Sequence, residues 1–151
     1  MIDGVIVARP KTVRDARGAV LRFLRTDDAH FAGFGEVYFS IVNAGVVKGW
    51  KRHREMTMAL SVPSGRVLLV LHDDRPGSAS RGVIQEIILS PDDHQVVMVP
   101  PLVWNGFMGL GGVPSVLANC ASILHRPDEA DTLAFDDPAI PYRWPADGVR
   151  E

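Results

Sequence analysis

Short apolar runs that alternate with turn-forming residues are the feature that most restricts how this chain can fold. Such runs favour strands of a sheet over helices that span a domain. The segments between them, which include DARG, NAG, PSG, DDRPGS and SPDD, are rich in Asp, Asn, Pro, Ser and Gly, which accept or pre-set turn dihedrals. The predicted strands are residues 5–8, 19–24, 35–42, 45–52, 56–62, 66–72, 83–89, 95–99, 106–110 and 115–123.

Helix signals are scarce. Residues 26–30 can form a turn, and residues 126–132, with Pro127 near their start, can form a short helix. The chain has 151 residues and 46% apolar content, which is enough to bury a core without disulfides or metals. We therefore expect one all-β domain over residues 1–151, built as a sandwich, jelly roll or small barrel.

Composition excludes several classes of function. The formal net charge of −2 gives no general attraction to nucleic acid, and no apolar run approaches the length needed to cross a bilayer. Cys120 is the single cysteine, so no intramolecular disulfide can form, and the N-terminus does not resemble a secretory signal. We expect a cytoplasmic protein with neither a nucleic-acid nor a membrane partner.

A dense cationic cluster lies inside one predicted strand. Lys48, Lys51, Arg52, His53 and Arg54 fall within seven residues, flanked by apolar strand-forming runs. In a regular pleat Lys51 and His53 share one face, and a bulge at Gly49 would bring Lys48 to the same side. Positive charge concentrated on a sheet needs either solvent or an anionic ligand. The cluster therefore indicates an anion-binding cavity, and the alternative is an edge strand on which charge discourages pairing.

Several landmarks, in order, resemble one known family. They are DARG, GVVKGW, the hairpin VPSGRVLLVLHDDR, the turn LSPDD, the strand VVMVPPLVWNGF and the tail CASILHRPDEADTLAFDDPAIPYRWP. Together they are similar to the dTDP-4-dehydrorhamnose 3,5-epimerase group of cupins, and the spacing from Gly49 to Gly65 is closer to the related sugar 3,4-ketoisomerases. The resemblance implies a double-stranded β-helix jelly roll that acts on nucleotide-linked 4-keto-6-deoxy sugars. It also implies a homodimer with N-terminal strand exchange, for which residues 2–8 are the candidate segment.

The resemblance carries over to particular residues only in part. Arg17 matches an arginine that contacts the nucleotide-sugar, often across the dimer, and Lys48 replaces an arginine. Lys51 stands where the family has its catalytic histidine, and His53 matches a second histidine of the ketoisomerases. Asn105 replaces a histidine before GF, and the expected tyrosine near Cys120 is replaced by Ala118 or Asn119.

Epimerisation beside a ketone needs a base, a group that stabilises the enolate and an acid on the opposite face. Lys51 or His53 is the candidate base, Lys48 or Asn105 the enolate stabiliser and Tyr38 the candidate acid. The remaining candidates are Arg17, Lys48, Arg52 and Arg54 for the diphosphate, and Trp104 for stacking on the substrate. A tryptophan in a half-buried strand is also commonly a core residue.

Two functions remain open. The first is an epimerase or ketoisomerase of a nucleotide-linked keto sugar, and the second is a catalytically lapsed cupin that binds a nucleotide-sugar or another anion. Metal-dependent cupins use histidines where this chain has Lys51 and Asn105, so we expect neither a metal nor another cofactor.

Overall fold

The computed structural model describes residues 1–146, so the last five positions of the predicted domain lie outside the described residues. The fold is almost entirely β, as predicted. Its strands are β1 (Ile6–Ala8), β2 (Thr12–Asp15), β3 (Gly18–Leu21), β4 (Glu36–Val42), β5 (Val47–His53), β6 (Met58–Ser64), β7 (Arg66–His72), β8 (Ile84–Leu89), β9 (Val96–Val99), β10 (Trp104–Leu110), β11 (Ser115–Ala121) and β12 (Ala130–Thr132). A 3₁₀ turn, η1 (Pro127–Glu129), precedes β12.

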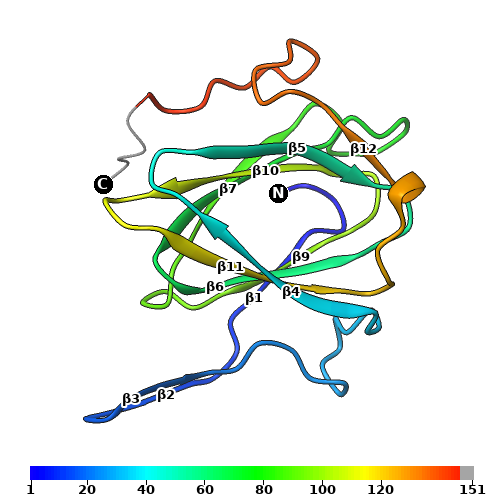
Figure 1. Ribbon diagram of the computed structural model, residues 1–151. Coiled ribbons are helices and arrows are strands. Elements are labelled where there is room, and N and C mark those ends of the chain that lie inside the picture. Colours follow the sequence, from blue (N-terminus) through cyan, green and yellow to red (C-terminus); the bar gives the residue numbers. More distant parts are fainter. Residues whose placement is uncertain (147–151) are drawn as a thin grey trace.

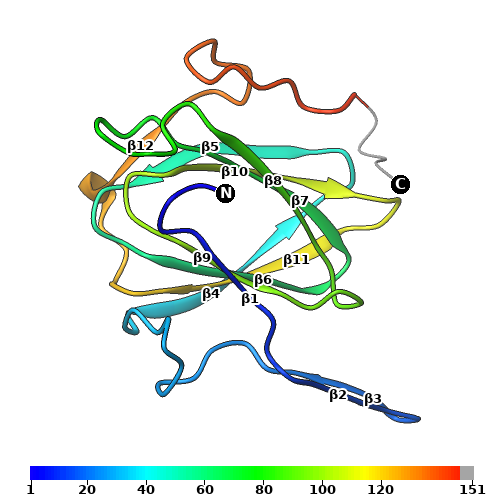
Figure 2. The same cartoon turned by 180° about the vertical axis from the view of Figure 1, so that it is seen from behind.

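Two antiparallel five-stranded sheets face each other. Sheet I has the order β1-β9-β6-β11-β4, and sheet II has the order β12-β5-β10-β7-β8. From β4 to β12 consecutive strands lie in alternate sheets, except that β7 and β8 are neighbours in sheet II, and this is the jelly-roll arrangement that the sequence predicts. Figures 1 and 2 show the N-terminus between the sheets and the hairpin β2–β3 projecting away from them.

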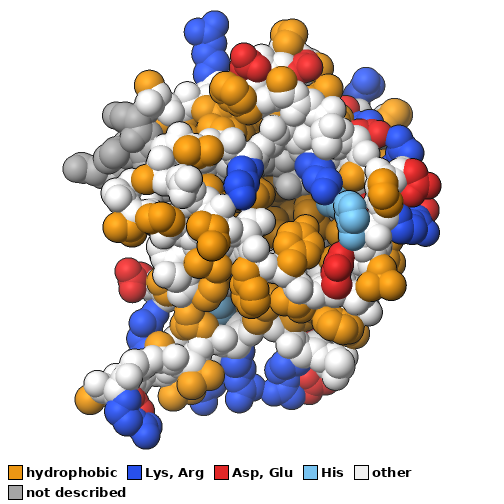
Figure 3. All heavy atoms as spheres, in the orientation of Figure 1, with side chains coloured by type: hydrophobic (Ala, Val, Ile, Leu, Met, Phe, Trp, Pro, Cys, Tyr) orange, Lys and Arg blue, Asp and Glu red, His pale blue; other side chains and the backbone are white. Residues whose placement is uncertain are grey.

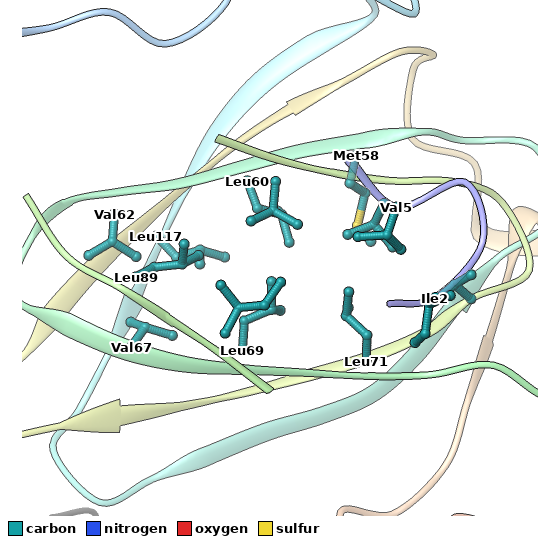
Figure 4. Close-up of a cluster of buried hydrophobic side chains, with 14 of the residues drawn as sticks. Ile2, Val5, Met58, Leu60, Val62, Val67, Leu69, Leu71, Leu89 and Leu117 are labelled. Carbon is teal, nitrogen blue, oxygen red and sulfur yellow. The ribbon is translucent and has the colours of Figure 1, made fainter. Parts of the chain in front are cut away.

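The core lies between the sheets, where alternate side chains meet. Figure 4 shows Leu60, Leu69 and Leu117 among the inward-facing side chains, and all three are buried. In β7 the alternate residues Leu68 and Val70 are buried too, because the chain after β12 covers the outer face of sheet II with side chains such as Ile140. Burial on both faces explains why this strand reads as a continuous apolar run.

The first residues of the chain close one end of the barrel. Ile2 and Val5 are buried, and Figure 4 shows them beside Met58 and Leu71 at the end of the core cluster. The backbone N–H of Ile2 donates to Gln85 Oε1 at 2.8 Å, and the following residue is held in the same way by a serine hydroxyl. These two hydrogen bonds hold the N-terminal segment at the end of the barrel that it closes.

Residues 2–8, the segment predicted to exchange between subunits, pack here within a single chain, and their exchange in a dimer stays a prediction. Strand β1 pairs with β9 of the same chain, and Ile2 fills the chain's own core. The element that projects is the β2–β3 hairpin, which turns at Gly18 with a φ of 137°.

The ten predicted strands all have counterparts, and the predictions missed two short ones. Strand β2 was missed because it is polar, and it is held by pairing with β3. The predicted helix over residues 126–132 is wrong beyond η1, because residues 130–132 pair with β5 instead. The predicted turn near residues 26–30 is confirmed by the N–H of Asp28, which donates to the carbonyl of Arg25. In the described part of the chain, no helix is long and apolar enough to cross a membrane.

Two isoleucines near the N-terminus test how the barrel is closed. Ile2 is 1% exposed and Ile6 is 45% exposed. We expect Ile2→Ala to lower the free energy of unfolding by about 2–5 kcal/mol and Ile6→Ala by less than about 1 kcal/mol, because only Ile2 leaves a cavity. Denaturant titrations measure both values. Equal losses of stability in the two variants would contradict closure of the barrel by Ile2.

Candidate functional site

A cavity of about 350 Å³ opens between the two sheets, and Met58, Leu60 and Leu117 of the core cluster form part of its wall. Figure 3 shows this face hollowed, with hydrophobic side chains inside the hollow and Lys or Arg side chains beside it. Both sheets contribute to the wall, and the volume of the cavity suits a small organic ligand. The lining residues are Tyr38, Ser40, Lys48, Gly49, Trp50, Lys51, His53, Met58, Leu60, Asn105, Phe107, Leu117, Asn119, Thr132 and Leu133.

A bulge in β5 brings two lysines to the cavity. Lys48 is the register partner of Phe107 and Lys51 that of Asn105, so two residues of β5 lie opposite one residue of β10. The bulge predicted at Gly49 is therefore present, and it turns two residues three positions apart toward the same side. The Asn105 side chain donates from Nδ2 to the Lys51 carbonyl at 2.7 Å and so holds the bulge in place.

The two lysines differ in their surroundings. Lys48 Nζ donates to the carbonyl of Ile41 at 2.8 Å, which ties it to the facing sheet. For Lys51, no carboxylate among residues 1–146 forms a salt bridge with its ammonium group. The cavity wall thus carries positive charge that is available to an anionic or electron-rich ligand.

The end of β5 carries a buried contact between a histidine and a carboxylate. His53 Nδ1 lies 2.5 Å from Glu129 Oε2, and both side chains are at most 2% exposed. The other oxygen of Glu129 accepts the backbone N–H groups of Glu55 and Met56, each at 2.8 Å. Because η1 leads directly into β12, whose Ala130 pairs with His53, the sheet register brings the two partners together.

The carboxylate at this pair is ionised. Burial alone raises the pKa of Glu129, but the hydrogen bonds from His53 and from two backbone N–H groups outweigh it and bring the pKa to about 2. A carboxylate that accepts from Nδ1 fixes the neutral histidine ring in the form whose Nε2 is unprotonated. Nε2 of His53 is buried and has no hydrogen-bond partner within residues 1–146, and His53 is one of the residues that line the cavity.

A second polar pair comes from the other sheet. Tyr38 on β4 is the register partner of Asn119 on β11. The side chain of Asn119 donates from Nδ2 to the Tyr38 hydroxyl oxygen at 2.8 Å. Both residues line the cavity, so a histidine from sheet II and a tyrosine from sheet I border the same space.

The structure brings only part of the predicted site together. Tyr38, Lys48, Lys51, His53 and Asn105 line the cavity. Glu129 was missed, because it lies 76 residues from His53 in a segment that reads as a short helix. Its only sequence signal is the acidic run DEAD after the last long strand, and that run does not single out one carboxylate.

The other predicted ligand contacts lie outside the cavity. Arg52 pairs with Asp74 and Asp131, at 3.1 and 2.9 Å, and its guanidinium lies 4.5 Å from the centre of the Trp104 ring. Trp104 is 5% exposed, packs in the outer core of sheet II and donates from Nε1 to Asp74. The polar groups of these side chains are already paired with one another. The placement of Arg52 therefore does not support its predicted contact with the diphosphate, and that of Trp104 does not support stacking on the substrate.

The last two predicted arginines are also paired. Arg54 Nη2 lies 2.5 Å from Asp131, on the same outer side as Arg52. Arg17, at the tip of the projecting hairpin, pairs with Asp15 at 2.6 Å, and its side chain is 90% exposed. Within one chain Arg17 does not reach the cavity.

The His53–Glu129 pair predicts how stability depends on pH. The pKa of Glu129 falls from 4.5 to about 2 on folding, so its contribution is present above pH 4.5 and is lost as the pH falls through about 2. We expect Glu129→Gln to flatten the fall in the free energy of unfolding in this window by up to about 1.4 kcal/mol per pH unit. Denaturant titrations between about pH 6 and about pH 2 measure the free energy of unfolding at each pH. Glu55→Gln is the matched control, and an unchanged slope in Glu129→Gln would contradict the lowered pKa of Glu129.

Comparisons with known proteins agree with this architecture. The chain is 33% identical over 138 residues to a probable low-salt glycan biosynthesis epimerase, Agl13, of Haloferax volcanii, and the match covers 88% of each chain. It is 27% identical to the spore coat polysaccharide biosynthesis protein SpsL of Bacillus subtilis, over 95% of this chain and 97% of that protein.

Solved structures and a family model match along nearly the whole length. The crystal structure of a dTDP sugar isomerase from Desulfovibrio desulfuricans superposes with a TM-score of 0.93 at 37% identity, and the match covers 98% of this chain and 97% of the other. A sequence model described as dTDP-4-dehydrorhamnose 3,5-epimerase matches residues 1–150. The chain therefore belongs to the dTDP-4-dehydrorhamnose 3,5-epimerase family.

Proposed function

We propose that the protein is an epimerase of a nucleotide-linked 4-keto-6-deoxy sugar, and that it works by removing a proton from a carbon next to the ketone. The observation that carries the proposal is the buried Nε2 of His53, which borders the cavity without a partner in residues 1–146 while an ionised Glu129 holds Nδ1. Such an arrangement is what a general base requires. Family membership and the names of the relatives support the substrate class.

The proton transfers have one arrangement that fits the cavity best. His53 Nε2 takes the proton from the carbon next to the ketone. The C–H electron pair becomes the C=C bond of an enolate, and the π electron pair of the carbonyl group moves to its oxygen. Lys51 or Lys48 stabilises that oxygen with an ammonium N–H. Tyr38 then donates its hydroxyl proton to the opposite face of the same carbon, which inverts it.

His53 is preferred over Lys51 as the base. A carboxylate partner orients His53, whereas Lys51 has no such partner in the described residues and presents an ammonium group to the cavity. The same first step, followed by proton return to oxygen and to the neighbouring carbon, would make the protein a 3,4-ketoisomerase. The products of the assay below separate the two reactions.

We also propose that the active form is a homodimer. The outward side chains of the edge strand β4, Val37, Phe39 and Ile41, are apolar and 45–65% exposed. The β2–β3 hairpin projects as an isolated two-stranded ribbon, an element that is marginal without a partner. A second copy would cover both, and Arg17 at the tip of the hairpin would then reach toward the partner's cavity and the diphosphate.

A cytoplasmic location is part of the proposal. Cys120 is the single cysteine, it is buried, and burial raises the pKa of its thiol. A protein without disulfides suits a reducing compartment.

Deuterium wash-in tests the assignment of the base. In D₂O, with dTDP-linked 4-keto-6-deoxyglucose, we expect the wild type to introduce deuterium next to the ketone and His53→Gln to slow this by about 100-fold or more. Proton NMR measures both the wash-in and the product. His125→Gln is the matched control, because His125 is exposed and does not line the cavity.

Lys51→Ala tests the proposed contact of Lys51 with the enolate oxygen in the same assay. We expect slower exchange by about 10²–10³-fold through loss of the enolate contact, with folding preserved.

Wild-type exchange in His53→Gln would remove His53 from the mechanism. Measurable binding of the substrate by the wild type without any wash-in would favour the lapsed, binding-only cupin.

A charged substitution on the exposed apolar side of β4 tests the proposed dimer. We expect Ile41→Glu to give a monomer, because a carboxylate on a buried apolar face is not solvated, and Val113→Glu to remain dimeric. The two side chains are 65% and 64% exposed in the single chain. Light scattering coupled to gel filtration gives the masses. A monomeric wild type, or a dimeric Ile41→Glu, would contradict this interface.

A further inference from the structure

Asn119 is a buried polar residue whose nearest inward neighbours on the same strand are apolar. Leu117 and Ala121, two positions before and after it, belong to the main hydrophobic core. Asn119 is 1% exposed, and its carbonyl oxygen Oδ1 is buried with no hydrogen-bond partner within residues 1–146. Leaving a buried acceptor unsatisfied is costly, so a side chain of this kind calls for a reason other than packing.

The amide group of Asn119 determines which way the Tyr38 hydroxyl can point. Nδ2 donates to the Tyr38 oxygen at 2.8 Å, so that oxygen is the acceptor in this bond. The phenolic proton then has to be directed elsewhere, and both side chains border the cavity. The two residues are direct register partners on β4 and β11, which holds them at a fixed separation.

The two unsatisfied buried atoms of the cavity come from opposite sheets. Oδ1 of Asn119 comes from sheet I, and Nε2 of His53 comes from sheet II. A sugar ring bound between the sheets would therefore have the base on one side and Tyr38 with Asn119 on the other. Polar atoms that are buried at a cavity and lack protein partners are the atoms that a ligand can satisfy.

We propose that Asn119 is a positioning residue that turns the Tyr38 hydroxyl proton toward the substrate and accepts, through Oδ1, a hydrogen bond from a hydroxyl group of the bound sugar. The inference rests on the proposed epimerase function, which it deepens by assigning the acid side of the cavity. Asn119 itself transfers no proton. It makes the inverting proton transfer from Tyr38 efficient and leaves removal of the proton by His53 unchanged.

Loss of the positioning role of Asn119 would change the kinetics in a way that loss of packing would not. If the base works but the acid is misdirected, the abstracted site exchanges with solvent and the proton returns to the face it left. Deuterium then enters the substrate without inversion. The ratio of wash-in to inversion therefore reports on the acid side alone, whereas a general loss of structure lowers both rates together.

The experiment measures initial rates of wash-in and inversion by NMR in D₂O, with dTDP-linked 4-keto-6-deoxyglucose. The variants are Tyr38→Phe, Asn119→Leu and the double variant, and the control is Val116→Thr, on the same strand outside the cavity lining. We expect the ratio to rise by about 10-fold or more in Tyr38→Phe and Asn119→Leu, with no further rise in the double variant. The KM should rise by about 3- to 10-fold in Asn119→Leu and not in Tyr38→Phe, because only Asn119→Leu loses Oδ1.

Asn119→Asp keeps the shape and removes the donor. A carboxylate can only accept, so it would draw the Tyr38 proton to itself, and we expect inversion to fall while wash-in continues. Wash-in by each variant also shows that the His53 side is folded. Wild-type inversion in Asn119→Asp, or a wild-type ratio in Asn119→Leu, would overturn the inference. If the wild type washes in no deuterium at all, the proposed function itself fails.

Discussion

The buried contact between His53 and Glu129 is the interaction on which the rest of the site depends. Removing either side chain would leave the other buried without this hydrogen-bond partner, so the two groups hold each other in place. The contact also fastens η1 and β12 to the end of β5, which forms one wall of the cavity. One pair of side chains thus joins β5 to η1 and sets the orientation of an imidazole ring that lines the cavity.

The jelly roll supplies the second requirement, two opposed faces. Because the chain alternates between sheets, neighbours in sequence such as β4 and β5 end on opposite sides of the cavity. Tyr38 and His53 therefore face one space from different sheets although only fifteen positions separate them. Inversion at a carbon needs groups on both of its faces, and this architecture provides them without any moving part. Lys51 and Asn105 depart from the family pattern that the sequence resembles, yet both line the cavity together with Tyr38 and His53.

The fold and half of the site could be predicted from the sequence, for reasons that individual residues make clear. Period-two alternation and turn residues determine strands locally, and the bulge that aligns Lys48 with Lys51 is signalled by Gly49. Glu129 could not be found, because its partner lies far away in sequence and its own segment becomes β12 only by pairing with β5. Arg52 looked free for the opposite reason, since nothing local reveals that Asp74 and Asp131 will pair with it.

The central claim is that a nucleotide-linked keto sugar binds with its reacting carbon beside His53. A crystal structure of the protein with such a substrate bound tests this most directly. The account predicts that the carbon next to the ketone lies about 3–3.5 Å from Nε2 of His53, with the Tyr38 oxygen on the opposite face of the ring. A sugar bound outside the cavity, or one that presents no carbon acid to Nε2, would contradict it.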